Sequence, residues 1–334
     1  MAIIFMENFE WATLSSAGVG SLAIRTDEIT ATSGLTGYID TGINGMYGKC
    51  LVITSTTTQL TRRLGWSLPT NYSTGLFSFA MSFTSGSHAN AFTFFGINTG
   101  ATNQIGIRLN VDGTISAMRN TTALGTSTLT LQTGTRYRVE IGFVISASVG
   151  EVVVKVNGVT FLNLSAVNTA NSGTTFNRFI FGALSVGTVY YDDIAFETDK
   201  TAFRDDFRIE TLYPTGDISK QSTPSTGSTA WAVIDETPVS TVDYTTFSGV
   251  QKDVYSLSDL SSNSTIYGVG IFSIGNKTDT NPASGQFVFN TPTVSTTGEV
   301  FAFNSASGLY STYYSGSYTA SDLNLSTIEV SKTV

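Results

Sequence analysis

Short segments along the chain alternate hydrophobic and polar positions, which is the pattern of β-strands that bury one face. The run 76–83 places its large side chains on one face and its small ones on the other. The runs 105–111 and 136–145 repeat this period of two, and further strand-like runs follow with short turns between them. No segment of about 12 residues or more has a helical period. We therefore predict an all-β fold, a β-sandwich of jelly-roll type.

The dipeptide Asn157-Gly158 is the clearest turn signal, because it lies between two β-rich runs, 150–156 and 159–165. Both residues accept positive φ, so the dipeptide predicts a two-residue type I′ hairpin. In this register one face collects the side chains of Val152, Val154, Val156, Val159 and Phe161. Leu162 would then face the opposite way. Asp112-Gly113 predicts a second hairpin turn.

A second β-rich region follows the first. The residues Glu197–Lys200 mark a boundary, so we expect a jelly-roll domain over 1–199 and a second, smaller β-sandwich module over 200–334. In this module we expect a strand at Phe207–Leu212 and an exposed polar loop at Lys220–Ala230. Order is expected to resume at Trp231–Ile234. Further strands are expected at Asp253–Leu257, Ile266–Ile274, Gly285–Phe289, Glu299–Phe303 and Ser326–Val330.

Charged residues make up only 13% of the chain, which has a net charge of −8 and a pI of about 4.6. Lys and Arg form no cluster larger than the pair Arg62-Arg63. Nucleic-acid binding needs a basic stripe that neutralises phosphates, so we expect no nucleic-acid partner and no binding to anionic membranes. No run approaches the ~18 apolar residues of a membrane span, so we expect no membrane insertion.

The single cysteine, Cys50, excludes an intrachain disulfide, which agrees with assembly in a reducing cytosol. It lies in an apolar run, so we expect an inert core thiol. The first residues of the chain lack the basic flank of a signal peptide.

Asp192-Asp193 is the most conspicuous carboxylate pair. Neighbours on a strand point to opposite faces, so the two cannot act as an acid/base pair unless a bulge intervenes. We expect one to be exposed and the other to bind loop backbone, with a rim Ca²⁺ site as the alternative. Asp206, Arg208 and Glu210 alternate on one predicted strand and are interpreted as a surface ion strip, with Asp205-Asp206 as a weaker metal candidate. We therefore predict no resident cofactor or metal.

Catalytic motifs are missing from the sequence. Jelly-roll glucanases use E-x-D-x-x-E on one strand, and the nearest string here, Asp235-Glu236 before Pro238, lacks the outer acids. His88 is the only histidine and lies in a predicted turn, without the partners that a catalytic triad or a zinc site would need. We therefore predict that the protein is not an enzyme and has no catalytic residues.

Tyrosines cluster near the C-terminus, at Tyr310, Tyr313, Tyr314 and Tyr318. Exposed tyrosines serve sugar stacking and protein interfaces alike. We expect this cluster to be a contact surface, with strand core and turns as the alternative.

Four segments together resemble tailed-bacteriophage virion proteins built on laminin-G-like (concanavalin A-like) jelly rolls. They are the opening 1–10, the strand pair 136–158 before the Asn-Gly turn, the run Y-Y-D-D-I-A-F at 190–196, and 203–217 with the runs 231–238 and 253–260. After residue 276 the chain departs from the family pattern.

The resemblance implies a concanavalin A/laminin-G-like jelly roll and a non-enzymatic structural virion protein, either a capsid decoration or a tail-associated component such as a fibre or knob. Its partners would be other virion proteins, in a homo-oligomer, and it would reside in the virion after assembly in the host cytoplasm. The alternative is a glycan-binding adhesion module for host-surface attachment. A depolymerase ranks last, because the acids do not cluster.

Overall fold

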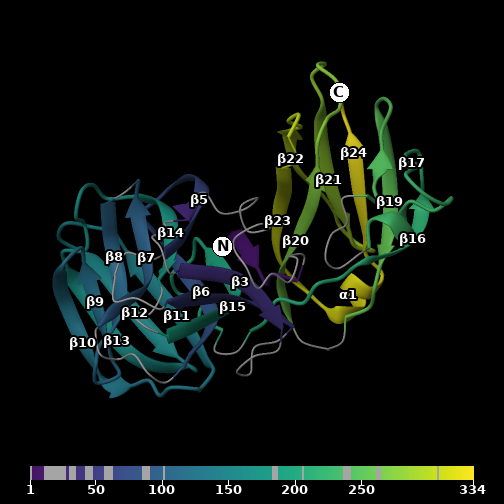
Figure 1. Cartoon of the computed structure of the whole chain (residues 1–334). Helices are drawn as coiled ribbons and strands as arrows, with labels where there is room; N and C mark the ends of the chain where they lie inside the picture. The colour runs from purple at the N-terminus through teal and green to yellow at the C-terminus, as the bar shows by residue number, and fades with distance from the viewer. Residues whose placement is uncertain are drawn as a thin grey trace. The chain divides into compact units, whose positions relative to one another are not determined.

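The computed structural model describes residues 2–10, 28–29, 35–41, 48–55, 63–84, 91–100, 102–182, 187–204, 207–235, 242–260, 265–306 and 308–334. Within these ranges the chain is almost entirely β and forms two compact units, the first ending at Ile209 and the second running from Glu210 to Val334 (Figure 1). The predicted all-β class is confirmed. Residues 200–209, which the sequence assigned to the second module, lie in the first unit.

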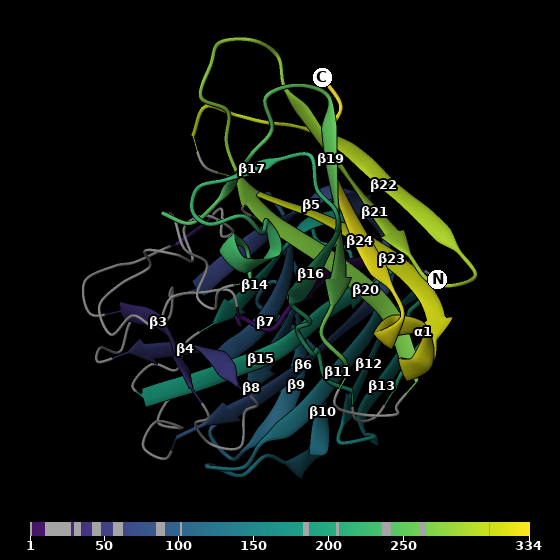
Figure 2. The ribbon, with the colours of Figure 1, turned by 90° about the vertical axis from the view of Figure 1, so that its right-hand side faces the viewer.

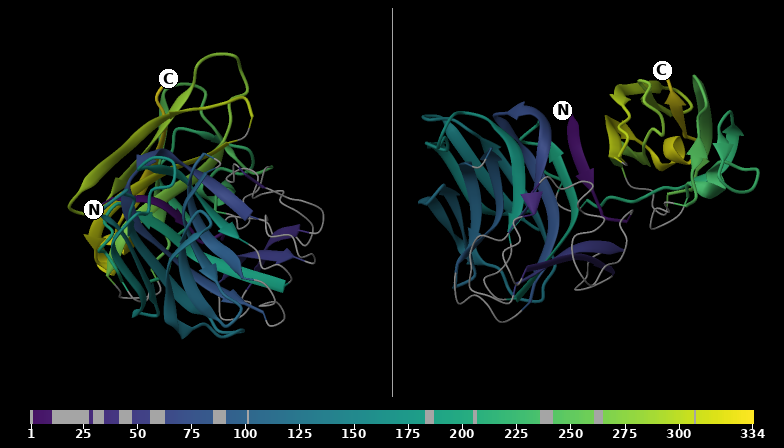
Figure 3. Two further views of the ribbon diagram at one scale, coloured as in Figure 1. Left: turned by 90° about the vertical axis from the view of Figure 1, so that its left-hand side faces the viewer. Right: turned by 45° about the horizontal axis from the view of Figure 1, so that its top comes forward.

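The first unit is a sandwich of two antiparallel sheets, which can be followed from two sides in Figures 2 and 3. The eight-stranded sheet has the order β13-β12-β11-β6-β15-β4-β3, and β1 also pairs with β15. Its strands are β1 (Ile3–Glu7), β3 (Leu35–Thr41), β4 (Lys49–Ser55), β6 (Thr74–Phe83), β11 (Tyr137–Val144), β12 (Gly150–Val156), β13 (Val159–Val167) and β15 (Gly187–Glu197).

The seven-stranded sheet has the order β10-β9-β8-β7-β14-β5-β2. Its strands are β2 (Glu28–Ile29), β5 (Arg63–Tyr72), β7 (Phe92–Thr99), β8 (Thr102–Leu109), β9 (Thr114–Arg119), β10 (Thr122–Thr130) and β14 (Phe176–Gly182). In both sheets strands that are distant in sequence pair, such as β6 with β15 and β14 with β5. This interleaving is that of a jelly-roll sandwich.

Aromatic side chains from both sheets fill the core of the first unit. The ring of Phe77 in β6 lies 4.5 Å from that of Phe196, 4.9 Å from that of Phe95 and 4.9 Å from that of Phe179, measured between centroids. Trp66 stacks on Phe179 at 5.4 Å. The alternation predicted for the run 76–83 therefore places its phenylalanines between the sheets, where offset and edge-to-face contacts add to the burial of apolar area.

The hairpin at Asn157-Gly158 is confirmed, with φ of 48° and 77° at its two central residues. Its register departs from the prediction beyond the second pair, Lys155 with Thr160. Val156 opposes Val159, but a bulge follows, and Val154 opposes Leu162 instead of Phe161. The extra residue turns Leu162 into the core, where it is 5% exposed.

The second unit has a five-stranded sheet of order β16-β19-β24-β21-β22 and two smaller pairs, β20 with β23 and β17 with β18. Its elements are β16 (Pro214–Ser219), β17 (Thr223–Pro224), η3 (Trp231–Val233), β18 (Thr245–Thr246), β19 (Gln251–Leu257), β20 (Ile266–Gly275), β21 (Ser284–Asn290), β22 (Ser295–Ala302), β23 (Gly308–Tyr318), α1 (Ala320–Asn324) and β24 (Thr327–Lys332). The ribbon β20–β23 covers one face of the larger sheet through a shared core, whose members are Ile271, Phe287, Phe289, Tyr314 and Leu323.

The strand expected at Phe207–Leu212 is not a strand, and the ordered segment expected at Trp231–Ile234 is not a strand either. Residues 207–213 have no strand partner, because their backbone groups bind side chains: the N–H of Ile209 donates to Asp193 and that of Tyr213 to Ser258. Trp231–Val233 forms a 3-10 turn instead, with the N–H groups of Ala230 and Trp231 donating to Asp217. In the described part of the chain, the helices are too short and too polar to cross a membrane.

Candidate functional site

Asp192 and Asp193 lie at a β-bulge, where the pairing of β15 with β6 shifts between Asp192 and Ala195. Asp193 has a φ of 49°, in the left-handed region that Asp tolerates better than most residues. Both side chains are buried as a result, each 1% exposed. The expectation that one of the pair is exposed is therefore wrong, and the cause is the backbone geometry of the bulge.

The two carboxylates have different surroundings. The N–H of Ile209 donates to Oδ1 of Asp193 at 2.7 Å, and Arg136 lies 3.5 Å from its Oδ2. The N–H of Asp193 donates to Oδ1 of Asp192 at 2.7 Å, whereas Oδ2 of Asp192 is buried without a hydrogen-bond partner among the described residues. Burial, and then the charge of Asp193, raises the pKa of Asp192 to about 9. Burial raises the pKa of Asp193 too, against the opposing charge of Arg138.

The segment that follows β15 is attached to this acidic face of the eight-stranded sheet. Arg204 forms an ion pair with Glu197, and its backbone N–H donates to Glu140 at 2.8 Å. The guanidinium of Arg138 lies 3.3 Å from the ring centre of Phe207. Glu140, Asp193 and Glu197 therefore hold residues 204–209 in place through their carboxylate oxygens.

The other predicted candidates are placed as follows. Cys50 is fully buried beside Val52, Ala80 and Tyr190, as expected for a core thiol. Asp235 follows η3 and is half-buried. His88, Asp205, Asp206 and Glu236 lie outside the described residues. Within the described ranges, no group of three or more His, Cys, Asp or Glu side chains is placed to hold a metal ion.

The four C-terminal tyrosines fall on β23. Tyr314 is 4% exposed and donates to the carbonyl of Phe287 at 3.0 Å. Tyr310 stacks on Phe301 at 4.7 Å, and Tyr318 packs edge-on against Phe289. Tyr314 is therefore core and does not belong to a contact surface. Their spacing of four residues places Tyr310, Tyr314 and Tyr318 on one face of the strand, a period-two signal already present in the sequence.

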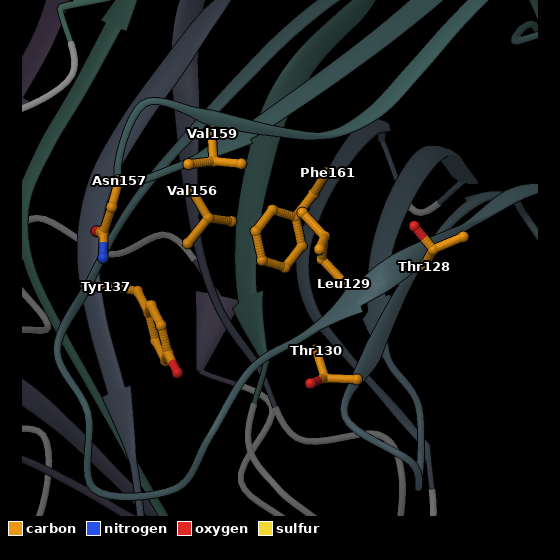
Figure 4. A pocket seen from close by; sticks show the side chains of 8 residues that line it. All are labelled: Thr128, Leu129, Thr130, Tyr137, Val156, Asn157, Val159 and Phe161. Atoms are coloured by element: carbon orange, nitrogen blue, oxygen red, sulfur yellow. The ribbon is translucent and has the colours of Figure 1, made fainter.

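An open depression of about 400 Å³ lies beside the Asn157-Gly158 hairpin (Figure 4). It is lined by Thr128, Leu129, Thr130, Tyr137, Val156, Asn157, Val159 and Phe161. The hydroxyl of Tyr137 already accepts the N–H of Gln132 at 2.6 Å. The lining offers apolar contact but no carboxylate, amine or imidazole, so it can accommodate an apolar group without acting on it.

Polar side chains gather on the face of the seven-stranded sheet that points away from the core. Register places Ser67, Arg178, Asn98 and Asn103 side by side across β5, β14, β7 and β8. Arg108 and Ser116 oppose each other on β8 and β9. We use the term polar face for Asn98, Asn103, Arg108, Asn110, Ser116 and Arg178.

Glycines lie in the strands directly beneath the side chains of the polar face. Gly106 opposes Gly96 in register, and Gly96 opposes Ile180. A Cβ on Gly96 would lie 2.8 Å from Nδ2 of Asn103, and one on Gly65 would lie 2.9 Å from Nε of Arg178. The missing side chains therefore let Asn103 and Arg178 lie close against the sheet.

Several groups of the polar face have unused hydrogen-bonding capacity. Nδ2 of Asn103 donates to Oδ1 of Asn98 at 3.3 Å, but Oδ1 of Asn103 and Nδ2 of Asn98 are buried without partners in the described chain. Asn110 is fully engaged by contrast: its Nδ2 donates to Ser116 at 2.8 Å and its Oδ1 accepts from Nε of Arg108 at 3.1 Å. Buried orphan amides call for an explanation, because an unmade hydrogen bond costs stability.

Sequence reasoning missed the polar face. Glycines inside the alternating runs 92–99 and 102–109 were a usable signal, because a strand-interior glycine marks a close approach. The pairing of β14 with β7, which brings Arg178 beside Asn98, joins segments far apart in the sequence and has no local signal.

Neither the family models nor the curated proteins contain a match to the chain. Solved structures of similar fold exist. They include the alginate lyase Aly36B, solved with an alginate tetrasaccharide (13% identity, TM-score 0.43, covering 58% of this chain and 96% of that one). An endo-β-1,4-glucuronan lyase from the fungus Trichoderma reesei matches at 12% identity and a TM-score of 0.41, covering 56% and 95%. A sialidase matches at 11% and 0.45, covering 59% of this chain and 18% of its own.

At these identities the likeness bears on the fold alone. The prediction that the protein is not an enzyme is wrong, because the solved structures of similar fold include lyases and a sialidase. The virion family, the virion partners and the virion location are tested by none of these matches and stay predictions.

Proposed function

We propose that the chain is a glycan-binding protein and that the polar face of the seven-stranded sheet is its binding surface. The observation that carries this proposal is the cluster of amide and hydroxyl side chains on this outward face, in which Asn103 bonds to Asn98 and Asn110 bonds to Ser116. A sugar hydroxyl both donates and accepts, so one hydroxyl can pair with an amide N–H and an amide oxygen together.

The shape of the surface supports the same class of ligand. Ile180 and Met118 lie between the polar side chains in register, opposite Gly96 and Gly106. Sugar rings have an apolar C–H face and polar edges, which this mixture of apolar and polar groups matches. A few placed polar groups around apolar contacts are what small-ligand sites share.

The setting of this binding remains the one implied by the sequence resemblance. On that reading the polar face attaches a virion to a glycan of the host surface. A structural role in capsid or tail rests on the resemblance of the four segments and has no further support from the described side chains.

The first prediction concerns Asn103. Asn103→Ala removes one donor and one acceptor from the polar face, and the loss of about 1 kcal/mol for a hydrogen bond weakens glycan affinity about fivefold. A glycan array with the whole chain identifies a bound glycan, and isothermal titration then measures both proteins. Thr160→Ala, on exposed β13 of the other sheet, is the matched control and should bind like the wild type.

Unchanged affinity in Asn103→Ala, at an unchanged melting temperature, would remove the polar face as the binding surface. A wild-type chain that binds no glycan on the array would overturn the proposed function altogether.

A further inference from the structure

The strand β1 docks on its own section of one edge of β15. It pairs with Ile194–Glu197, whereas β4 pairs with Gly187–Tyr191, on the other side of the bulge at Asp192-Asp193. The opposite edge of β15 is taken by β6. The section that β1 covers is therefore a docking place of its own, and it is filled by a strand that is far away in the sequence.

The side chains of β1 complete the aromatic core. Phe5 is 6% exposed, and its ring lies 5.0 Å from that of Phe179 and 6.3 Å from that of Trp66, measured between centroids. Ile3 and Met6 are buried as well. Without these side chains the core would contain a cavity, so a copy of β1 has to fill this place in every folded molecule. The contacts are the same whichever copy of the chain supplies the strand.

The exit from β1 is strained. Phe9 has a φ of 61°, in the left-handed region that a bulky side chain adopts only at a cost in free energy. Its neighbours are fastened on both sides. Nδ2 of Asn8 donates to the carbonyl of Ile209 at 3.1 Å. Oε1 of Glu10 accepts the N–H of Lys49 at 2.6 Å, so the bend between the two attachments falls on Phe9.

We infer that β1 is exchanged between two copies of this chain, so that β1 of each copy pairs with β15 of the other. The two chains are identical, so the register and the core contacts of β1 are kept. The difference lies at Phe9, where the connection runs on to the second copy and φ becomes extended. Relief of this strain favours the exchanged dimer, because strained hinges promote exchange, and mass action favours it as the protein concentration rises. The exchange is independent of the proposed glycan binding.

Cysteines at two positions that face each other across β1 and β15 test the exchange. Met6 and Ala195 are partners in the register. Met6→Cys and Ala195→Cys are placed in separate chains with different C-terminal tags, co-expressed and treated with a mild oxidant. A disulfide needs Cβ atoms within about 4.5 Å of each other, so it links the two chains only where β1 of one lies on β15 of the other. The native Cys50 is buried and is common to all the chains.

We expect the Met6→Cys and Ala195→Cys chains to become linked. Thr160→Cys, exposed on β13, replaces Ala195→Cys in the control for chance collisions, and this pair should stay unlinked. The double variant Met6→Cys/Ala195→Cys shows that the two positions can be bridged. Sedimentation of the wild type should show a dimer whose fraction rises with protein concentration.

A second comparison tests the hinge at Phe9. Phe9→Gly and Phe9→Ala both remove the ring, but glycine accepts a positive φ and alanine does not. The strain of the closed form is therefore relieved in Phe9→Gly alone. We expect its dimer to be about fivefold or more weaker than that of Phe9→Ala, the effect of freeing one residue from a disfavoured left-handed φ. Melting temperatures of both variants show that they are folded.

A wild type that sediments as a monomer at a concentration of about 100 μM would overturn the exchange. The same conclusion would follow if Met6→Cys and Ala195→Cys stayed unlinked while the double variant closed its disulfide within one chain. Equal dimer strength in Phe9→Gly and Phe9→Ala would overturn the strained hinge as its cause.

Discussion

The protonation of Asp192 differs between the folded and the unfolded chain. Its pKa is about 9 in the folded protein, raised from 3.8 chiefly by burial. The folded state therefore holds a proton that the unfolded state releases above pH ~4. The contribution of Asp192 to the free energy of unfolding is complete at low pH and is lost progressively as the pH rises from about 4 to about 9.

Asp192→Asn tests this sign. The amide is neutral at every pH, so we expect the variant to gain stability relative to the wild type as the pH rises from 5 to 9. The measurement is urea unfolding of both proteins across that range, read as the difference between them. Asp193→Asn is the contrast: it loses charge beside Arg136 and Arg138, and breaking a buried pair destabilises. A difference for Asp192→Asn that stays flat with pH would contradict the assignment.

The acid pair also shows what a residue pattern can and cannot predict. Period-two alternation correctly places the side chains of β6, because that strand is regular between Phe77 and Phe83. It fails at Asp193, whose left-handed φ and bulge depend on contacts with Ile209 and Arg138 from elsewhere in the chain. Asp tolerates the positive φ of such a bulge, but its presence in a sequence does not predict one.

At the level of elements, the Asn157 turn does more than reverse the chain. Oδ1 of Asn157 accepts the N–H of Arg138 at 2.7 Å, and the N–H of Asn157 donates to the carbonyl of Arg138 at 2.8 Å. The hairpin tip is thereby fastened to the start of β11. The positive φ of the turn and the hydrogen bond to Arg138 both depend on Asn157.

Asn157→Ala should therefore lower the free energy of unfolding by about 1–2 kcal/mol, from the lost acceptor and the positive φ that Ala tolerates poorly. Asn157→Asp keeps an acceptor and tolerates the same φ, so it serves as the control and should lose less. Urea unfolding at pH 7 measures both. Equal stability of the two variants would show that the side-chain acceptor contributes nothing.

Local signals predicted elements well where the strand forms its own pattern. Thr114–Arg119 is a strand over the expected residues, and the Asp112-Gly113 turn precedes it with Gly113 at a φ of 84°. Phe207–Leu212 had the same kind of pattern and is not a strand, because a side-chain acceptor took the backbone N–H of Ile209. That acceptor is Asp193, 16 residues away in the sequence, and the pattern of a short segment cannot predict such a contact.

For the whole molecule, each unit has its own aromatic core, around Phe77 in the first and around Phe289 in the second. We expect the two cores to respond separately to heat. Phe77→Ala and Phe289→Ala each remove a fully buried ring, which costs about 3–5 kcal/mol in the unit concerned.

Scanning calorimetry of the full chain measures this. Phe77→Ala should lower the transition of the first unit and leave that of the second in place, and Phe289→Ala should do the reverse. A single transition that both variants shift equally would contradict independent cores.

The acids at the bulge also determine how far the first unit extends along the chain. The N–H of Arg204 donates to Glu140 and that of Ile209 donates to Asp193, so the segment after β15 stays bonded to the eight-stranded sheet as far as Ile209. These two amide hydrogens should therefore exchange with solvent only when the first unit opens locally, and their exchange rates report the stability of that unit.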